Sequence, residues 1–302
     1  MSIVELGFLG FRAQVVGPSE LLCTFRALTP LTPQRWTIAP GGSGIGSRAE
    51  FRLYPRRHER DTRHVPDQID HTAPVDIERD GVHLATAQGH HEALAFLLWA
   101  IHTAAVEHLG STYLLFHAGA VARGRFGILL PGPSGTGKTT LVAALVAAGF
   151  SYLGDDIAPI DPASLTLLPF SKSLGVKAGA RRILTSAYPE LLRSVPRLRA
   201  GGESVWYLPP PQDSWPSSAA SVRCVVFPRY QARARTSLAL IGRSDALKQL
   251  IEQSFGLGRH GVSGIAAAVN MLQEAECYEL TMGSLRASVH VIQELADRDQ
   301  SS

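Results

Sequence analysis

A phosphate-binding loop and a pair of adjacent aspartates lie close together near the middle of the chain. The loop at residues 132–139 reads Gly-Pro-Ser-Gly-Thr-Gly-Lys-Thr and fits the pattern G-x-x-x-x-G-K-[ST]. Glycines in such a loop let the backbone wrap around an anion, so that successive N–H groups point inward. Asp155 and Asp156 follow one helix and one short strand later. The spacing predicts a polyphosphate held beside two carboxylates.

The segments around the loop favour a nucleotide site. An apolar strand, "GILLP", precedes the loop, and an apolar helix is expected over 139–148, where its N-terminus would add positive partial charge. Lys138 is expected to reach the β- and γ-phosphates of ATP, and the Thr139 hydroxyl to hold Mg²⁺. The alternative is a glycine-rich turn without a nucleotide. The expected nucleotide contacts are Gly132, Pro133, Ser134, Gly135, Thr136, Gly137, Lys138, Thr139 and Thr140.

The aspartate pair is expected at the end of the strand that follows the loop helix. A later apolar strand, at 222–230, ends without a carboxylate, so Asp155 and Asp156 are the candidates for the second acidic element of the site. One carboxylate can hold the metal or its bound water, and the other can accept the proton of an attacking hydroxyl. A helix cap or a turn is the competing interpretation of Asp-Asp.

These motifs resemble a known group of kinases. "FHAGAVARGRFGILLPG", the loop and "GDD" at 154–156 look like the bacterial HPr serine kinase/phosphorylase family, and closer still like the HPr-kinase-related kinases found beside peptide-modification genes. "SGTGKTTL" with "GDD" also resembles the nucleotide site of ATP-dependent phosphoenolpyruvate carboxykinase. The resemblance covers roughly 110–180 and is weaker over 200–295. It implies an α/β P-loop core of this type.

The resemblance also implies roles for individual residues. His117 in "LLFHAGA" matches a histidine that is a metal ligand in the carboxykinase and lies near the transferred phosphate in HPr kinases; a satisfied core histidine is the alternative. The acid pair supplies base and metal contact, with Asp156 assigned as base or metal contact beside Thr139, and Asp155 as its partner. Lys177, and less firmly Lys172, are phosphate contacts by the same resemblance. The expected catalytic set is Asp155, Asp156, His117 and Lys138.

One departure from the family is important. The Glu-Ile-Arg-Gly type signature of HPr kinases is missing, and "PFSKSLGVKAGARR" stands in its place. HPr is therefore not the expected substrate, and phosphorylase activity is not expected.

Composition describes an ordinary globular protein. Of 302 residues, 45% are apolar and 18% charged, and the net charge of +3 gives no case for a nucleic-acid partner. Only four lysines occur, and three of them fall between 138 and 177. The three cysteines lack disulfide or zinc spacing, and no signal peptide or membrane-length apolar run is visible. A cytoplasmic setting is expected.

Two regions are expected. Residues 1–90 are predicted to be a β-rich N-terminal region, with strands at "LLCTFRAL", "EFRLYPR" and "DGVHLATA", and the polar run "RRHERDTRHVPDQIDH" as a solvated loop. Residues 91–302 are predicted to form the P-loop kinase domain, beginning with a buried helix over 91–109. The segment 180–222 is expected to be largely loop, with a helix near 181–194.

The favoured hypothesis is an ATP-dependent kinase acting on a hydroxyl. The expected acceptor is a serine of a protein or of a ribosomally made precursor peptide. A small-molecule alcohol kinase and a non-catalytic nucleotide-binding regulatory protein are the alternatives. The expected cofactors are ATP and Mg²⁺, the expected partner is the acceptor protein or peptide, and self-association is expected by resemblance only. Candidate arginines for the phosphoryl charge are Arg181, Arg182, Arg229 and Arg259.

Overall fold

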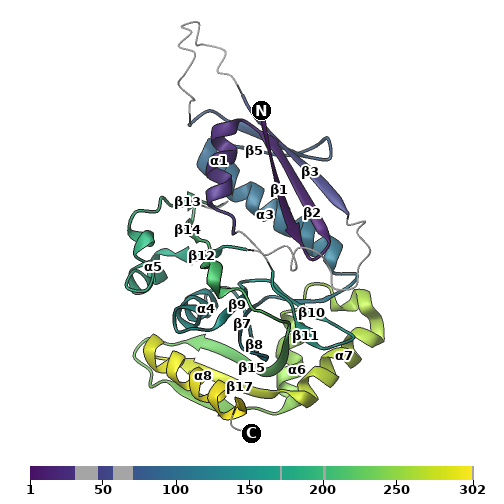
Figure 1. Ribbon diagram of the computed structural model, residues 1–302, viewed down its shortest axis with the longest axis vertical. Coiled ribbons are helices and arrows are strands. Elements are labelled where there is room, and N and C mark those ends of the chain that lie inside the picture. Colours follow the sequence, from purple (N-terminus) through teal and green to yellow (C-terminus); the bar gives the residue numbers. More distant parts are fainter. Residues whose placement is uncertain (31–46, 57–70, 171, 200–201, 301–302) are drawn as a thin grey trace, which may run out of the picture.

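The protein is a mixed α/β structure with several sheets, shown as a ribbon in Figure 1. The computed structural model describes residues 1–30, 47–56, 71–170, 172–199 and 202–300. The polar run expected as a solvated loop lies almost wholly outside these residues.

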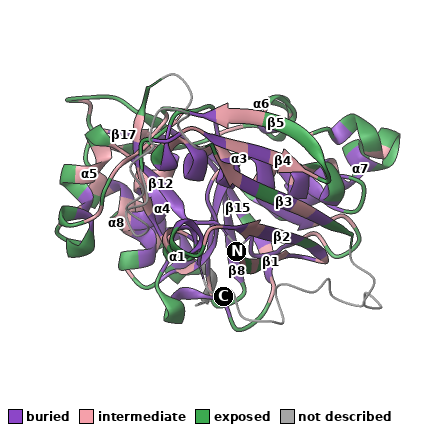
Figure 2. Cartoon of the chain, turned by 90° about the horizontal axis from the view of Figure 1, so that it is seen from above, coloured by how far each residue is buried: buried purple, intermediate pink, exposed green. Residues whose placement is uncertain are grey.

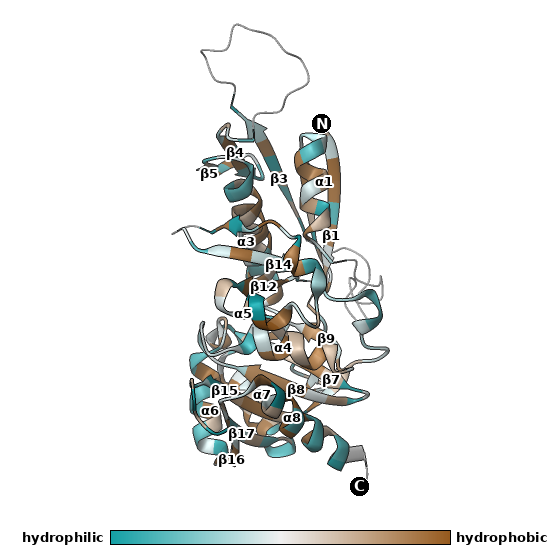
Figure 3. Ribbon diagram, turned by 90° about the vertical axis from the view of Figure 1, so that its left-hand side faces the viewer, coloured by the Kyte–Doolittle hydropathy of each residue, from teal (hydrophilic) through white to brown (hydrophobic). Residues whose placement is uncertain are grey.

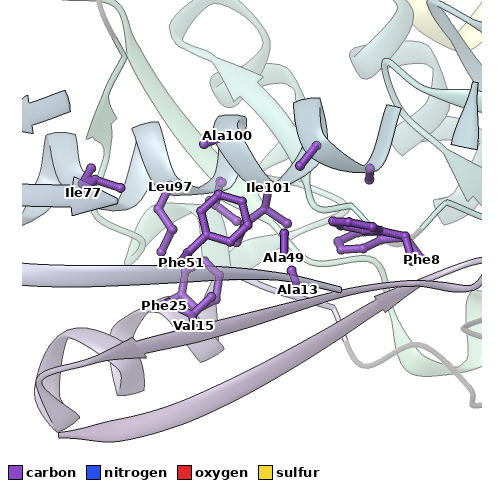
Figure 4. Packing of buried hydrophobic residues seen from close by; sticks show 14 of the residues in the cluster. Phe8, Ala13, Val15, Phe25, Ala49, Phe51, Ile77, Leu97, Ala100 and Ile101 are labelled. Atoms are coloured by element: carbon purple, nitrogen blue, oxygen red, sulfur yellow. The ribbon is translucent and has the colours of Figure 1, made fainter. Parts of the chain in front are cut away.

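A five-stranded sheet in the order β1-β2-β3-β4-β5 forms the N-terminal part. Only the pairing of β2 with β3 is parallel. Two helices pack against the sheet, and Phe25, Phe51 and Ile101 meet in the core between them (Figure 4). The elements are β1 (Ser2–Phe8), β2 (Phe11–Gly17), α1 (Ser19–Ala27), β3 (Arg48–Pro55), β4 (Val75–Arg79), β5 (Val82–Ala87) and α3 (His90–Leu109).

The strand predicted at "LLCTFRAL" is wrong, because this segment forms helix α1. Leu21, Leu22 and Phe25 are its buried residues, and their spacing places them on one face of a helix. A short apolar run is ambiguous between strand and helix, and packing against the N-terminal sheet decides it here.

Helix α3 forms where the sequence predicts a buried helix, and it packs on the N-terminal sheet. Its buried side chains belong to the same apolar cluster as Phe8, Phe25 and Phe51. Helix α3 therefore packs as part of the N-terminal region. The boundary expected after residue 90 would instead assign it to the second region. That cluster also reaches into the second region, because Phe170 stacks on Phe8 with ring centroids 5.1 Å apart.

The second region is built on a nine-stranded sheet in which β8, β15 and β17 run parallel. Every residue of β8 is buried, as expected for a parallel strand covered on both faces (Figure 2). The strands are β6 (Leu114–Phe116), β7 (Ala118–Arg123), β8 (Phe126–Pro131), β9 (Ser151–Gly154), β10 (Ala158–Asp161), β11 (Thr166–Leu167), β15 (Ala220–Tyr230), β16 (Ser237–Leu240) and β17 (Glu276–Met282).

Four helices cover the two faces of this sheet (Figure 1). Helices α4 and α8 share one apolar cluster, and α6 and α7 share another on the opposite face. Helix α4, which follows the phosphate-binding loop, is largely hydrophobic in Figure 3 because it packs against both the sheet and α8. The helices are α4 (Lys138–Ala147), α6 (Arg243–Glu252), α7 (Gly261–Glu274) and α8 (Leu285–Gln300).

A small three-stranded sheet, in the order β12-β14-β13, occupies part of the segment that was predicted to be largely loop. The helix expected near 181–194 is α5, which spans Ala178–Leu184 and ends well before the predicted limit. These strands have two to five residues, too short for a clear pattern in the sequence. They are β12 (Leu174–Lys177), β13 (Arg197–Leu198) and β14 (Ser204–Leu208), with short 3₁₀ turns at Pro189–Leu192, Gln212–Ser214 and Leu257–His260.

Candidate active site

The phosphate-binding loop joins the end of β8 to the start of α4. Gly135 and Gly137 adopt left-handed φ values of 91° and 94°, a region that favours glycine. A Cβ atom at Gly137 would also come within 2.5 Å of the Met282 side chain, so both backbone angle and space require glycine there. The Tyr230 amide, at the end of β15, donates to the Thr136 carbonyl at 3.1 Å and fixes the loop against the sheet.

Lys138 points back into the loop. Its side chain is almost fully buried, and its Nζ donates to the carbonyl oxygens of Gly132 at 2.6 Å and Pro133 at 3.0 Å. Burial lowers the pKa of Lys138, and the negative charges of Asp156 and Asp155 oppose that change. The ammonium therefore lies within the backbone cradle, between the loop and the aspartate pair.

Asp155 is bound to the first turn of α4. The Thr139 hydroxyl donates to both carboxylate oxygens, at 3.0 and 3.1 Å, and the Asp155 side chain is completely buried. Burial is the largest cause that raises the pKa of Asp155, to about 6, and the neighbouring charge of Asp156 adds to it. Lys172 and the Thr139 hydrogen bond act in the opposite direction.

Asp156 is the more exposed of the two aspartates, with 32% of its side chain exposed. Its φ of 69° lies in the left-handed region, which aspartate tolerates better than most residues. Its carboxylate lies 3.0 Å from the Lys172 ammonium and 3.7 Å from Nε2 of His117. Burial acts to raise the pKa of Asp156, but Lys172 and the hydrogen bond from His117 outweigh it and hold the pKa well below its usual range.

Lys172 bridges the two carboxylates. Its ammonium is 3.8 Å from Asp155 and 3.0 Å from Asp156, with only 8% of the side chain exposed. The Tyr152 hydroxyl donates to the Lys172 carbonyl at 2.7 Å and fixes the backbone there. Burial acts to lower the pKa of Lys172, but the two carboxylates outweigh it and raise the pKa. The structure thus places this lysine on the acid pair rather than on the phosphate-binding loop.

His117 lies between β6 and β7 and connects the loop to the acid pair. Its carbonyl accepts a hydrogen bond from the Gly132 amide at 3.4 Å, and its own amide donates to the Gln253 carbonyl at 2.6 Å. The ring contacts Asp156 on one side and lies 6.0 Å from the Phe255 ring on the other. The histidine expected from the resemblance is therefore next to the acid pair.

Lys177 lies at the rim of the phosphate-binding loop. Its ammonium is 3.5 Å from the Ser134 hydroxyl and forms an ion pair with Glu203 at 2.9 Å. Pro133, Ser134 and Gly135 form the exposed tip of the loop. Lys138 thus lies inside the loop, and Lys177 lies at its edge.

Comparison with solved structures gives a distant likeness. No family model matches the chain, and no curated protein matches it. Among solved structures, the HPr(Ser) kinase/phosphatase from Coxiella burnetii is similar over 62% of this chain and 95% of that chain, with 12% identity and a TM-score of 0.28. A likeness this distant carries no argument about activity, so function must be argued from the residues of the site.

Two of the four candidate arginines are engaged elsewhere. Arg181 donates to the carbonyls of Leu191 and Leu192 and lies over the Trp206 ring at 5.0 Å. Arg259 donates to the Glu107 carbonyl at 3.1 Å.

The other two candidate arginines are exposed. Arg182 lies on α5, and Arg229 lies at the end of β15, next to the Tyr230 amide that contacts the loop. Of the two, Arg229 is therefore the one whose neighbour in the chain is hydrogen-bonded to the phosphate-binding loop.

The donor set fits Mg²⁺ bound together with a nucleotide. Within the described part of the chain, no group of three or more His, Cys, Asp or Glu side chains could hold a metal ion. Mg²⁺ in nucleotide sites keeps several waters and needs only one or two protein ligands besides the substrate phosphates. The Thr139 hydroxyl and the Asp155 carboxylate offer that pair.

No helix among the described residues is long and apolar enough to cross a membrane.

Proposed function

We propose that the protein is an ATP-dependent kinase that transfers a phosphoryl group to a hydroxyl, on a serine of a protein or of a ribosomally made precursor peptide. The observation that carries the proposal is the hydrogen bond between Thr139, in the phosphate-binding motif, and the buried Asp155. It ties the expected magnesium ligand to the acid pair. The proposal includes a P-loop core of the HPr kinase and phosphoenolpyruvate carboxykinase type, which the order of the motifs supports.

The geometry supports a division of labour between the two aspartates. Thr139 and Asp155 would hold Mg²⁺, which supplies charge neutralisation between the phosphates. Asp156 is ionised at neutral pH and more exposed, so it can accept the proton of the acceptor hydroxyl. This assignment keeps Asp156 as the base and moves the expected metal contact from Asp156 to Asp155.

A peptide or protein acceptor is supported by the surface that begins at the rim of the site. Strand β12 ends at Lys177, beside Ser134, and α5 follows directly. The segment from α5 to β13 exposes four large apolar side chains, Ile183, Leu192, Val195 and Leu198, together with arginines. Apolar and cationic groups side by side can bind an extended acidic peptide.

Incubation with γ-labelled ATP tests the proposed function. Label in serine peptides supports the proposal, whereas label in a small alcohol would move the acceptor to a metabolite. Nucleotide binding without transfer to either would leave only a regulatory nucleotide-binding protein and overturn the kinase. Water as acceptor would appear as release of labelled inorganic phosphate.

Replacement of Lys138 by methionine is expected to weaken nucleotide binding. The change removes the buried ammonium from the cradle, and a hydrogen bond to a charged group contributes about 1.5–3 kcal/mol, or roughly a 10–100-fold change in Kd. Titration with Mg-ADP and Mg-ATP measures it. Lys248→Met is the matched control, because this exposed lysine lies on α6 outside the site. Equal affinities of Lys138→Met and wild type for the nucleotide would contradict nucleotide binding by the loop.

Mg²⁺ dependence of nucleotide binding is expected to weaken in acid. The pKa of Asp155 is raised to about 6, so below that pH its carboxyl binds a proton and loses the charge that a metal requires. At limiting Mg²⁺, the gain in ADP affinity from the metal should fall by about tenfold per pH unit below this point. Asp155→Asn is the control, because the nucleotide phosphates still titrate with this variant while the carboxyl is absent. The same pH profile in both proteins would contradict the metal role of Asp155.

A further inference from the structure

The guanidinium of Arg199 lies directly over Gly175 in strand β12. A Cβ atom at Gly175 would come within 2.9 Å of Nη2 of Arg199, closer than real Cβ contacts, so a larger residue would displace the guanidinium. The φ of Gly175 is outside the left-handed region, so the glycine is explained by this close approach rather than by backbone conformation.

Gly175 places this guanidinium at the border of the acid pair. The Gly175 amide lies 3.5 Å from Oδ2 of Asp155, the carboxylate that binds Thr139. Two residues further along the same strand, Lys177 contacts the phosphate-binding loop at Ser134. Glu203, across the turn from Arg199, holds Lys177 at 2.9 Å. The pairing of β13 with β14 thus brings Arg199 to the side of the candidate active site.

The positive charge of the Arg199 guanidinium favours the binding of an anion. Within the described residues its side chain makes no ion pair, and its backbone alone is hydrogen-bonded, to Glu203 and Gly202. Its positive charge adds to that of Lys172: burial lowers the pKa of His102 to about 3, and both cations push it in the same direction. A half-buried guanidinium next to another cation is costly without a counter-charge, and its planar fork matches phosphate and carboxylate oxygens.

We propose that Arg199 binds an oxyanion of the reacting substrates at the border of the Asp155–Asp156 pair. The oxyanion is either the phosphoryl group to be transferred or an acidic group next to the acceptor hydroxyl. This inference rests on the proposed function and extends it by a binding residue and by an acidic substrate group.

The first arm of the test measures nucleotide affinity. Arg199→Gln is titrated with Mg-ADP and with Mg-AMP-PNP, an ATP analogue that keeps the third phosphoryl group. If Arg199 binds that group, Kd for AMP-PNP rises by about 10-fold or more while Kd for ADP stays within twofold, and Arg199→Lys recovers part of the loss. Arg193→Gln is the matched control, because Arg193 is exposed on the same segment.

The second arm measures the acceptor. Transfer from γ-labelled ATP is compared between a peptide pool with aspartate beside serine and the same pool with asparagine there. If Arg199 binds an acidic group of the acceptor, wild type prefers the aspartate pool by about 10-fold or more, and Arg199→Gln loses the preference. Arg193→Gln should keep it.

Each outcome decides the inference. A loss confined to Arg199→Gln in either arm supports it and names the source of the oxyanion. Values equal to wild type in both arms, or the same losses in Arg193→Gln, overturn it while leaving the proposed function intact. A wild-type protein that binds neither nucleotide overturns the proposed function, and the inference falls with it.

Discussion

Replacement of Asp156 by asparagine is expected to lower kcat for phosphoryl transfer by about 10²–10⁴-fold, the range for a residue in general base catalysis. The carboxylate is the more exposed of the pair and lies beside His117 and Lys172. Asparagine keeps the shape and tolerates the left-handed φ of 69°, so the fold should be retained. Rapid-quench transfer from labelled ATP measures kcat.

Nucleotide binding separates this role from a loss of the site. Because Asp155 and Thr139 keep their contact in Asp156→Asn, Kd for Mg-ADP should stay close to wild type. Asp155→Asn is the matched comparison and should lose the gain in affinity from Mg²⁺. A folded Asp156→Asn protein with wild-type kcat would exclude Asp156 as the base, and a shared loss of Mg²⁺-dependent affinity would exclude the division of labour.

Replacement of Lys172 by methionine is expected to destabilise the protein strongly. The ammonium is the cation within 4 Å of both aspartates, and Asp155 is completely buried. Removing one partner of a buried ion pair costs about 3–5 kcal/mol, because the remaining charge has no compensation. Urea unfolding followed by circular dichroism measures the free energy of unfolding.

The pH dependence identifies the cause of that loss. Without the lysine, the pKa of Asp155 rises further above about 6, so the variant binds a proton there at a higher pH than wild type does. The difference from wild type in the free energy of unfolding should therefore shrink as the pH falls toward about 6, where Asp155 of the wild-type protein is protonated as well. Lys172→Arg keeps a cation and should retain most of the stability, and Lys248→Met should be neutral. A Lys172→Met protein as stable as wild type at neutral pH would contradict the bridge.

Local patterns in the sequence were sufficient to predict the strand and the helix on either side of the glycine-rich loop at 132–139. The expected strand and helix correspond to β8 and α4, because the cradle for an anion is built from consecutive residues. The prediction that His117 lies near the acid pair came from a resemblance to known kinases. In the structure, Nε2 of His117 lies 3.7 Å from the carboxylate of Asp156.

Contacts between distant segments could not be predicted. Lys172 was singled out by the scarcity of lysine, but its contact with both aspartates depends on how the chain returns after β11. The close approach of Arg199 to Gly175 depends on a sheet of very short strands, which leave no periodic signal. Helix α1 was missed because a short apolar run fits either a helix or an edge strand, and only packing chooses.

A crystal structure with Mg²⁺ and AMP-PNP would show whether the site is arranged for phosphoryl transfer. We expect the β- and γ-phosphates within the loop at Lys138, the ion on Thr139 and Asp155 directly or through one water, and Asp156 facing the terminal phosphoryl group. A nucleotide bound elsewhere, or an ion held without Asp155 while Asp156 faces away from the phosphoryl group, would contradict phosphoryl transfer at this site.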